Sequence, residues 1–532
     1  MNSVAPTIPA ALIDTASRFA DHEAIVDGEV RLTYAELHQR VRDCARLFIA
    51  EGVREGDRVA IWSPNTHHWV QAALGALYAG ATLVPINTRY TGHEALDILR
   101  RTRATALVVA GPFLGVDRLA ELRAAAGADG LPALHTVLRI PVEGELPPDE
   151  HALDFTAVAR DAIDVSAADV DLRLAQAAPG EPSDILFTSG TTGRSKGAMS
   201  AHTQSLSVAR AWADVGGLTA GDRYLVINPF FHSFGYKAGI LAALQCGATL
   251  IPQASFDVDE TFRLIETEGI TVLPGAPTIY QMMLAHPKRG EHDLSSLRLA
   301  VTGAATVPVV LVERMRDELK FDVVLTAYGL TEAVVATMCV PSDKPETVAN
   351  TCGRPAAGFE IRTVDDTGTP RPAGEPGEVL LRGPNVMLGY LDDPAATAEA
   401  IDADGWLHTG DVGVLDQHGY LKITDRIKDM YVSGGFNVYP AEVEQVMARL
   451  PGVLDAAVIG VPDERLGEVG KAYIQGKSAD ELSESDVIEH CKRLVANYKV
   501  PRQVEFVAEL PRNATGKVLK WVLRDQASKE LL

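Results

Sequence analysis

The sequence contains little cysteine. Five cysteines occur in 532 residues, at positions 44, 246, 339, 352 and 491, and none of them form a C-x-x-C pair. An odd number of cysteines without metal-ligand spacing excludes a disulfide framework and a zinc-ribbon site. We therefore expect a reduced, cytoplasmic protein.

Positive charge is also scarce. Lys and Arg number 49 against 71 Asp and Glu, which gives a net charge of −22. Nucleic acid and anionic membranes both require basic surfaces, so neither is an expected partner. The first residues lack the basic and apolar stretches of a secretory signal, and we expect none.

Long membrane-spanning runs are missing too. The uncharged runs 69–86 and 238–256 approach spanning length, but each contains glycine and polar residues and includes a proline near its end. A buried helix followed by a buried strand explains both runs better. We therefore expect no integral membrane segment.

Length and periodicity favour a multidomain α/β protein. A chain of 532 residues exceeds one typical core, and 46% hydrophobic with 23% charged residues is ordinary for a globular enzyme. Short apolar strands at 58–62, 106–109, 270–273 and 323–325 alternate with amphipathic helices. That alternation predicts sheets covered by helices.

Two further patterns refine this organisation. Segment 76–85 echoes segment 243–252, and each predicts a helix, a glycine stop and a short strand ended by proline, as in two similarly built halves. Between 360 and 425, β-rich stretches predict a smaller, partly open β-barrel or antiparallel subdomain. From about 429 an α+β unit is expected, with a helix from 440, a strand at 456–460 and a helix at 484–495.

Residues 188–197 (Thr-Ser-Gly-Thr-Thr-Gly-Arg-Ser-Lys-Gly) follow the strand-like residues 184–187. Glycines let the backbone approach a ligand closely, and amide groups, hydroxyls and a lysine suit a phosphate chain. This is not a Walker A loop, because Ser195 precedes Lys196 where that motif has glycine. Composition alone would equally fit a flexible surface loop.

Four other segments resolve that ambiguity. They are Tyr-Gly-Leu-Thr-Glu at 328–332, Gly-Trp-Leu-His-Thr-Gly-Asp at 405–411, residues 425–429 running into 434–440, and Pro-Arg-Asn-Ala-Thr-Gly-Lys at 511–517. In this order the five segments resemble the adenylate-forming (ANL) superfamily of acyl-CoA synthetases, peptide-synthetase adenylation domains and luciferases, over nearly the whole chain.

The resemblance implies a fold. It comprises a large N-terminal domain of two helix-covered β-sheets plus a small β-barrel-like subdomain, residues 1–427, and a small mobile C-terminal α+β domain, residues 428–532. It also implies an ATP- and CoA-dependent carboxylic acid ligase. The carboxylate attacks the α-phosphorus of ATP, pyrophosphate leaves, and the CoA thiol then attacks the acyl-adenylate. Charge accumulates in such a transition state, which calls for Mg²⁺, donors and lysines.

The resemblance also assigns roles to nucleotide-binding residues. The β- and γ-phosphates are held by Thr188, Ser189, Gly190, Thr191, Thr192, Gly193 and Lys196. Glu332 binds Mg²⁺ with help from Thr188, since hard oxygen ligands suit that ion. Tyr328, in one motif with Gly329 and Thr331, stacks on adenine, and the opposite wall is Gly303, Ala304 and Ala305. Asp411 accepts hydrogen bonds from the ribose hydroxyls, supported by Arg426.

Further roles concern the acid and the moving domain. Lys517 bridges the carboxylate and the α-phosphate, and His232 gates the carboxylate. Lys428 is the hinge about which the small domain rotates to bring in Gly434 and Gly435 for the thiol step. Without the resemblance, each functional residue has a bland alternative: a helix-end carboxylate for Glu332, a turn former for Asp411, an exposed turn lysine for Lys517 and a structural histidine for His232. Lys237 is interpreted as a surface lysine.

Substrate choice rests on closer similarity. Segments 61–65, 228–239 and 301–308 resemble actinobacterial ligases that activate the bicyclic 7a-methyl-1,5-dioxo-octahydroindene propanoate left from steroid rings C and D in cholesterol catabolism. A medium- or long-chain fatty acid or an aromatic acid is the alternative. In segment 228–239, Phe231, Phe234 and Tyr236 would block a long tunnel, while Gly235 and Gly239 would leave room sideways.

Three other classes are less consistent with the residues. A carrier-protein ligase differs only in its thiol acceptor, and no carrier domain follows Lys517. A P-loop switch would need the missing Walker loop, and an inactive nucleotide-binding regulator would be expected to lose Lys517 or Glu332. The small-molecule partners are then the acid, ATP and CoA, and a homodimer is left open.

Overall fold

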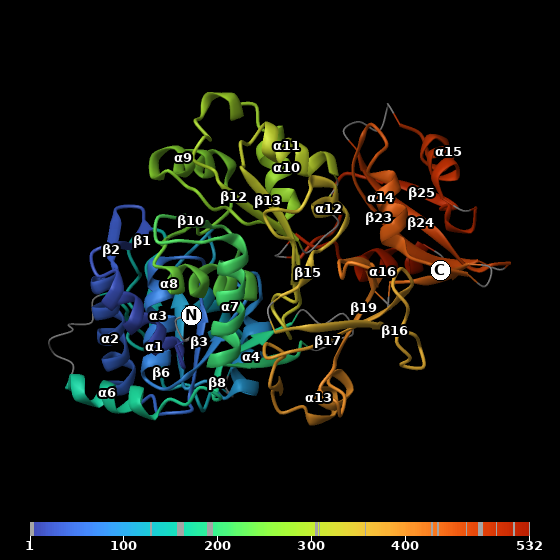
Figure 1. Ribbon diagram of the computed structural model, residues 1–532. Coiled ribbons are helices and arrows are strands. Elements are labelled where there is room, and N and C mark those ends of the chain that lie inside the picture. Colours follow the sequence, from blue (N-terminus) through green and yellow to red (C-terminus); the bar gives the residue numbers. More distant parts are fainter. Residues whose placement is uncertain are drawn as a thin grey trace.

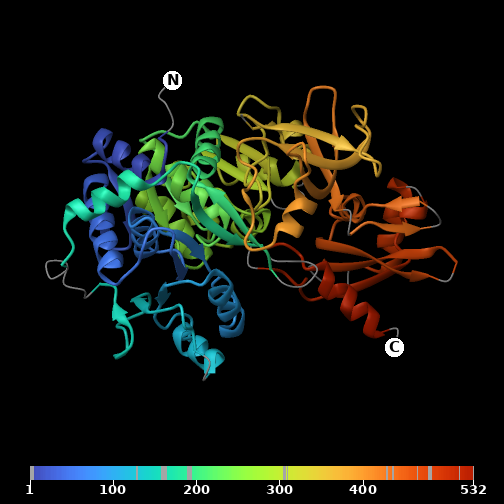
Figure 2. The same cartoon turned by 90° about the horizontal axis from the view of Figure 1, so that it is seen from below.

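The computed structural model describes residues 5–530, apart from 128–129, 157–163, 189–194, 304–306, 308, 357, 427–428, 434–435, 464, 477–481, 496 and 514–515. The N-terminal two thirds of the chain form helices and sheets on one side, and the C-terminal residues form a separate group beside them (Figure 1). The view from below shows the same division (Figure 2).

An eight-stranded sheet lies at the centre of the larger part. Its order is β18-β9-β8-β4-β3-β5-β6-β7. The strands are β18 (Gly389–Tyr390), β9 (Gly197–Ala201), β8 (Pro182–Phe187), β4 (Thr82–Pro85), β3 (Arg58–Trp62), β5 (Ala106–Ala110), β6 (Thr136–Ile140) and β7 (Leu153–Asp154). Strands β3 to β8 run parallel, whereas β9 and β18 are antiparallel additions at one edge.

Alternate residues of the central strands enter different cores. In β3, Val59 and Ile61 belong to one hydrophobic cluster, and Ala60 and Trp62 belong to another. Successive strand side chains point to opposite faces, so this sheet is buried on both. The first cluster also contains side chains of α1 (Ile8–Arg18), α2 (Tyr34–Ala50), α3 (His67–Tyr78) and α7 (His202–Gly216), and the second contains those of α4 (Gly92–Thr102) and α5 (Arg118–Ala126).

A second sheet covers the far side of the first cluster. Its strands are β10 (Arg223–Val226), β11 (Thr249–Pro252), β1 (Glu23–Asp27) and β2 (Val30–Thr33) in the order β10-β11-β1-β2, and β12 (Leu299–Gly303), β13 (Val323–Tyr328), β14 (Thr337–Met338) and β15 (Arg354–Pro355). Val272 bridges Tyr224 of β10 and Leu299 of β12, which joins the two groups. The predicted strand 270–273 is therefore wrong as a strand: Val272 supplies single bridges only.

The predicted echo corresponds to a repeated structural unit. Helix α3 leads through Gly80, at φ 82°, into β4, and α8 (Ala242–Cys246) leads through Gly247, at φ 75°, into β11. A positive φ is the reason for glycine at both stops. One copy lies in each large sheet, as expected for two similarly built halves.

No described helix is long and apolar enough to cross a membrane.

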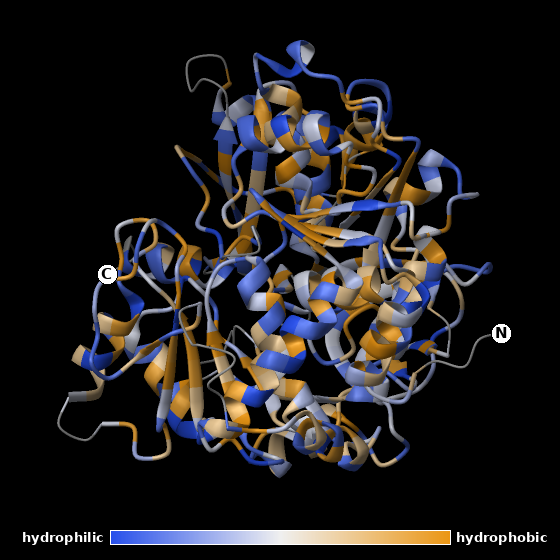
Figure 3. Ribbon diagram, turned by 90° about the vertical axis from the view of Figure 1, so that its left-hand side faces the viewer, coloured by the Kyte–Doolittle hydropathy of each residue, from blue (hydrophilic) through white to orange (hydrophobic). Residues whose placement is uncertain are grey.

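The smaller units follow the sequence-based expectation. Four of the strands between residues 360 and 426 form an antiparallel sheet: β16 (Glu360–Val364), β17 (Pro376–Arg382), β19 (Leu407–Leu415) and β20 (Leu421–Arg426). The C-terminal unit has β21 (Tyr431–Ser433), β22 (Phe436–Val438), β23 (Val453–Asp463), β24 (Gly467–Gly476) and β25 (Gln503–Val507), with α14 (Pro440–Met447), α15 (Glu484–Leu494) and α16 (Lys520–Glu530). Hydrophobic residues concentrate on the strands, and hydrophilic residues on outer helix faces and loops (Figure 3). The mixed α/β fold class with a C-terminal domain is confirmed.

Candidate active site

The phosphate loop leaves β8 and returns in β9. The Thr188 amide donates to the Lys196 carbonyl at 2.9 Å, so the two residues close the base of the loop. Of the predicted phosphate ligands, Ser189, Gly190, Thr191, Thr192 and Gly193 lie outside the described residues. The structure thus brings Thr188 and Lys196 together at the carboxyl end of a buried parallel strand, a common position for ligand binding.

Arg101, on α4, contacts the end of this loop just before Lys196. Its Nη1 donates to the Ser195 carbonyl at 2.7 Å, and its guanidinium lies 5.0 Å from the ring centroid of Phe187. The side chain also pairs with Asp97 at 3.3 Å. A cation behind the loop therefore fixes the backbone next to Lys196.

Glu332 lies on the turn that follows β13. Its Oε1 accepts a hydrogen bond from the Tyr390 hydroxyl at 2.7 Å, and its backbone carbonyl accepts from the Met387 amide at 2.7 Å. Burial, with Glu332 as a second cause, raises the pKa of Tyr390 well above its usual range, so the phenol stays protonated and donates. Lys196 Nζ lies 5.0 Å from the centroid of the same ring.

The described residues of the predicted adenosine site lie at the ends of β12 and β13 and on β19. Tyr328 closes β13, and its hydroxyl donates to Oδ2 of Asp411 on β19 at 2.6 Å. The Asp411 carboxylate is almost completely buried, and the Asp411 amide donates to Thr409 Oγ1 at 3.0 Å. Tyr328 and Asp411 come from different sheets and from distant parts of the sequence, yet they are direct neighbours, as one nucleotide site requires.

Two glycines of this region are required by close backbone approach. A Cβ at Gly303 would lie 2.4 Å from the Ala327 carbonyl oxygen, and one at Gly329 would lie 1.6 Å from that of Val334. Thr331 lies beside Glu332 on the same turn. Ala304 and Ala305, the remaining predicted wall, lie outside the described residues.

His232 precedes an unusual helix. Its Nδ1 accepts a hydrogen bond from the Phe234 amide at 3.2 Å, and burial lowers its pKa to about 4. The ring is therefore neutral at pH 7 with its proton on Nε2, so it can donate one hydrogen bond and does not carry a positive charge. Residues Phe234–Leu241 then form a π-helix, a rare element often found at functional sites.

This π-helix corrects two interpretations. Lys237 is fully buried, not on the surface, and its Nζ lies 2.9 Å from Asp184 Oδ1, whose carboxylate is also fully buried. Gly235 leaves no room sideways, because a Cβ there would lie 2.2 Å from the Pro229 carbonyl oxygen. Gly239 likewise faces Val226 at 3.1 Å. Gly235 thus packs against backbone, and Gly239 packs against the Val226 side chain, so neither leaves the expected space.

The buried ion pair joins two parts of the site. Asp184 lies on β8 shortly before Thr188, and Lys237 lies shortly after His232. The other carboxylate oxygen, Oδ2, accepts hydrogen bonds from Ser183 Oγ at 2.7 Å and Ser205 Oγ at 2.9 Å. The pair therefore ties the strand of the phosphate loop to the π-helix behind His232.

Loss of one partner of this pair should be costly. We expect Lys237→Met to lower the free energy of unfolding by about 3–5 kcal/mol, because the Asp184 carboxylate is left buried and uncompensated. The double variant Lys237→Met with Asp184→Leu should recover much of that loss. Urea denaturation followed by tryptophan fluorescence measures both, and an additive double variant would contradict the coupling.

Lys517 lies on a loop against the larger part of the chain. Its amide donates to Asn513 Oδ1 at 2.9 Å, and Arg512 Nη1 donates to the Gly516 carbonyl at 2.7 Å. Gly516 has φ 81°, and a Cβ there would lie 3.3 Å from Thr278 Oγ1 at the start of α10 (Pro277–Ala285). The lysine loop of the C-terminal unit thus contacts the N-terminal residues that follow Val272.

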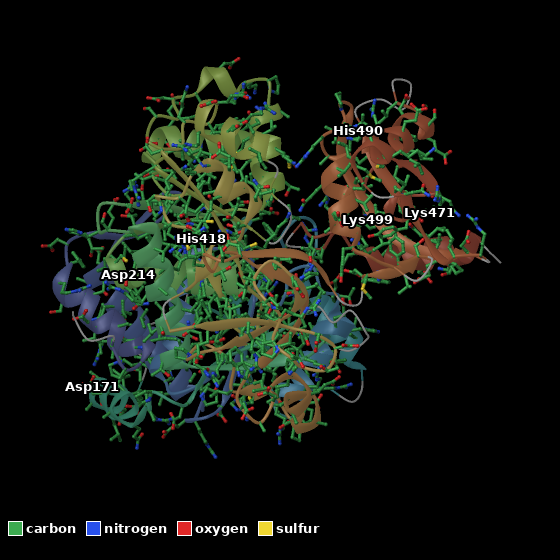
Figure 4. All side chains as sticks on the ribbon, turned by 45° about the vertical axis from the view of Figure 1, so that its right-hand side comes forward. Asp171, Asp214, His418, Lys471, His490 and Lys499 are labelled. Carbon is green, nitrogen blue, oxygen red and sulfur yellow. The ribbon has the colours of Figure 1, made fainter. Side chains whose placement is uncertain are left out.

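Other basic side chains of the C-terminal unit contact residues of the same unit. Lys471 pairs with Glu505 at 2.9 Å and Lys499 pairs with Glu442 at 2.7 Å, while His490 Nε2 lies 3.0 Å from the Val446 carbonyl (Figure 4). The Lys517 loop differs in lying against another part of the chain. Lys428, Gly434 and Gly435 lie outside the described residues, and of Arg426 only the backbone is described, paired with Asp411 across β19 and β20.

Sequence reasoning missed Tyr390 and Arg101. Both make their contacts with residues distant in the sequence, and neither lies in a segment whose composition suggests phosphate chemistry. The local signal for Tyr390 is weak: it lies between Gly389 and Leu391, in a short and mostly apolar segment. Among the described residues, no cluster of three or more His, Cys, Asp or Glu could hold a metal. A single carboxylate with substrate phosphates is, however, the usual set for Mg²⁺, which fits Glu332.

Comparison with known proteins shows which family the chain belongs to. A family model described as AMP-binding enzyme matches residues 12–391, and one described as AMP-binding enzyme C-terminal domain matches residues 442–517. The chain is 59% identical to a 3-[(3aS,4S,7aS)-7a-methyl-1,5-dioxo-octahydro-1H-inden-4-yl]propanoyl:CoA ligase of Rhodococcus jostii, over 98% of each chain. It is also 59% identical to a ligase of the same name from Mycobacterium tuberculosis, over 98% of each.

A solved structure is similar as well. The anthranilate CoA ligase AuaEII in complex with anthranoyl-AMP superposes with a TM-score of 0.86 at 28% identity, over 99% of this chain and 98% of that one. The chain therefore belongs to the AMP-binding enzyme family of adenylate-forming enzymes. It is an acid–thiol ligase that forms an acyl-adenylate and then an acyl-CoA thioester, with ATP, Mg²⁺ and CoA.

Proposed function

We propose that this ligase activates the steroid-derived bicyclic propanoate named in its two 59% identical relatives, as a step of steroid catabolism. That identity, over 98% of the chain, is the observation that carries the proposal. A fatty acid or aromatic acid is the alternative substrate. We also propose a cytoplasmic location, where ATP and CoA are available, and a domain boundary at 427/428. A homodimer stays a prediction.

The described residues support a division of labour at the nucleotide. Lys196 supplies a cation and Thr188 a hydroxyl at the base of the phosphate loop, where the leaving pyrophosphate carries its charge. Glu332, oriented by Tyr390, holds Mg²⁺ together with Thr188, and Mg²⁺ when bound neutralises phosphate charge. Tyr328 and Asp411 bind adenine and ribose, and Arg426 lies beside Asp411.

The acid is handled by two other groups. Neutral His232 donates from Nε2 toward a carboxylate oxygen without forming a salt bridge that would weaken the nucleophile. Lys517 approaches from the C-terminal unit and stabilises the charge that develops between carboxylate and α-phosphate. The thiol step then uses Lys428 as hinge and the segment carrying Gly434 and Gly435.

The magnesium assignment gives a direct prediction. We expect Glu332→Ala to raise the Mg²⁺ concentration for half-maximal activity roughly tenfold or more and to lower turnover, because the ion loses its protein carboxylate. Titration of activity against Mg²⁺ measures the shift. Glu360→Ala removes an exposed carboxylate paired with Arg382 and serves as the control. An unchanged titration curve for Glu332→Ala would make that residue structural.

A panel of acids tests the function as a whole. Pyrophosphate release is measured with and without CoA for the bicyclic propanoate, straight-chain acids of increasing length and ferulate. The proposal expects CoA-dependent turnover and thioester formation to be most efficient with the bicyclic acid. Greatest efficiency with ferulate or a straight-chain acid would replace it with the alternative.

A further inference from the structure

Tyr390 is fixed by the backbone next to the phosphate loop. Its strand β18 pairs with β9, the strand that leaves this loop, with Tyr390 opposite Ala198. The Leu388 amide donates to the Met199 carbonyl and the Leu391 amide donates to the Gly197 carbonyl, both at 2.8 Å. With 9% of its surface exposed, the side chain has little freedom to leave this position.

From there the side chain contacts two groups of opposite charge. Its hydroxyl donates to Glu332 Oε1 at 2.7 Å, and Lys196 Nζ lies 5.0 Å from its ring centroid. The amide of Met387, just before Tyr390 in the chain, holds the Glu332 backbone carbonyl at 2.7 Å. One short segment therefore orients Glu332 through both its main chain and its side chain.

The site has to keep these two charges available for different ligands. A direct pair between the Lys196 ammonium and the Glu332 carboxylate would compete with the triphosphate for the lysine and with Mg²⁺ for the carboxylate. A neutral aromatic ring attracts a cation over its face, and a phenol donates to a carboxylate at its edge. Tyr390 satisfies both groups without bringing them together.

We propose that Tyr390 is a positioning residue that separates Lys196 from Glu332 and directs each toward its own ligand. The hydroxyl binds one carboxylate oxygen of Glu332 and so orients the carboxylate toward Mg²⁺. The ring binds the Lys196 ammonium and so keeps it available to the phosphates. The inference rests on the proposed role of Glu332 and adds a residue that acts through it. Groups that orient a metal ligand commonly change metal affinity about 10–100-fold.

Binding measurements separate the two contacts. ATP affinity is measured by calorimetry without acid or CoA, first in EDTA and then in saturating Mg²⁺. Tyr390→Phe keeps the ring, so we expect ATP affinity in EDTA to stay within about twofold, while the gain from Mg²⁺ falls about tenfold or more. Tyr390→Leu removes the ring too, and we expect its affinity in EDTA to fall several-fold as well.

Tyr420 offers a matched control. Its hydroxyl donates to Asp343 Oδ1 and accepts from Arg354 Nη2, and the Arg354 guanidinium lies 4.4 Å from its ring centroid. Tyr420 therefore also contacts a carboxylate and a cation, in the residues just before β20. Tyr420→Phe should leave both affinities unchanged. Equal melting temperatures of the phenylalanine variants and the parent exclude a folding defect.

Two results would overturn the inference. If Tyr390→Phe keeps the full gain from Mg²⁺ while Glu332→Ala loses it, Glu332 binds the ion without Tyr390, and only the positioning role fails. If Glu332→Ala also keeps the gain, the magnesium assignment itself fails, and the role of Tyr390 fails with it.

Discussion

Replacement of Lys517 by alanine is expected to abolish adenylation while largely sparing thioester formation from a supplied acyl-adenylate. Loss of one charge partner in a transition state typically lowers the rate by about 10²–10³. The Lys517 loop lies against Thr278 in the N-terminal part, so its cation is presented from outside that part. In the proposed function, the thiol step uses a different arrangement of the C-terminal unit, so we expect that step not to need the lysine.

Two assays separate these steps. Pyrophosphate release reports adenylation, and CoA consumption with synthetic acyl-adenylate reports the thiol step. Lys529→Ala, which removes an exposed lysine paired with Asp525, is the control. Near-normal pyrophosphate release by Lys517→Ala would show that this lysine does not assist adenylation.

The second large effect concerns the acid. We expect kcat/KM for the steroid-derived propanoate to exceed that for palmitate by at least about 10²-fold, a gap that one or two steric misfits can produce. A rigid bicyclic acid needs a wide, short and mostly apolar pocket, whereas a straight chain needs a long tunnel. The aromatic side chains behind His232 are held in place: Tyr236 packs on Trp69 with centroids 5.9 Å apart, and Phe234 packs on Trp212 at 5.4 Å.

Steady-state kinetics over a range of both acids measure this ratio. Octanoate is the control for hydrophobicity without great length, because poor turnover of octanoate as well as palmitate would point to ring shape as the feature selected. Comparable efficiency on palmitate would contradict the expectation and favour the general fatty acyl alternative.

Much of the architecture could be predicted because local sequence determines it. The strand at 58–62 follows from an apolar run, and the helix–glycine–strand units follow from the positive φ that Gly80 and Gly247 adopt. The motif at 328–332 likewise places Tyr328 at the end of β13 and Glu332 on the turn that follows it. In each case neighbours in sequence are also neighbours in space.

The remaining features depend on contacts that no local pattern contains. Lysine is usually a surface residue, so its type alone suggests that Lys237 is exposed. The fold instead places it in an apolar interior, beside Asp184 of the earlier strand β8. From the sequence, Gly235 is expected to leave space beside the helix. In the structure the Pro229 carbonyl occupies that space. Tyr390 contacts Glu332 because β18 pairs with β9, a strand from a much earlier part of the chain.

The hydrophobic clusters show which parts of the chain share a core. The small antiparallel sheet packs its core residues Phe359, Val379 and Leu407 against Ala333 and Ala336, with Tyr328 and Leu330 at the margin. By contrast, the two clusters formed by described residues of the C-terminal unit include no residue before 431. A cut near the start of β21, made to exchange modules between related ligases, would therefore leave these hydrophobic clusters undivided. A cut between β15 and β16 would divide the cluster that supports the turn carrying Glu332, so the proposed nucleotide site and the antiparallel sheet are expected to be exchanged together.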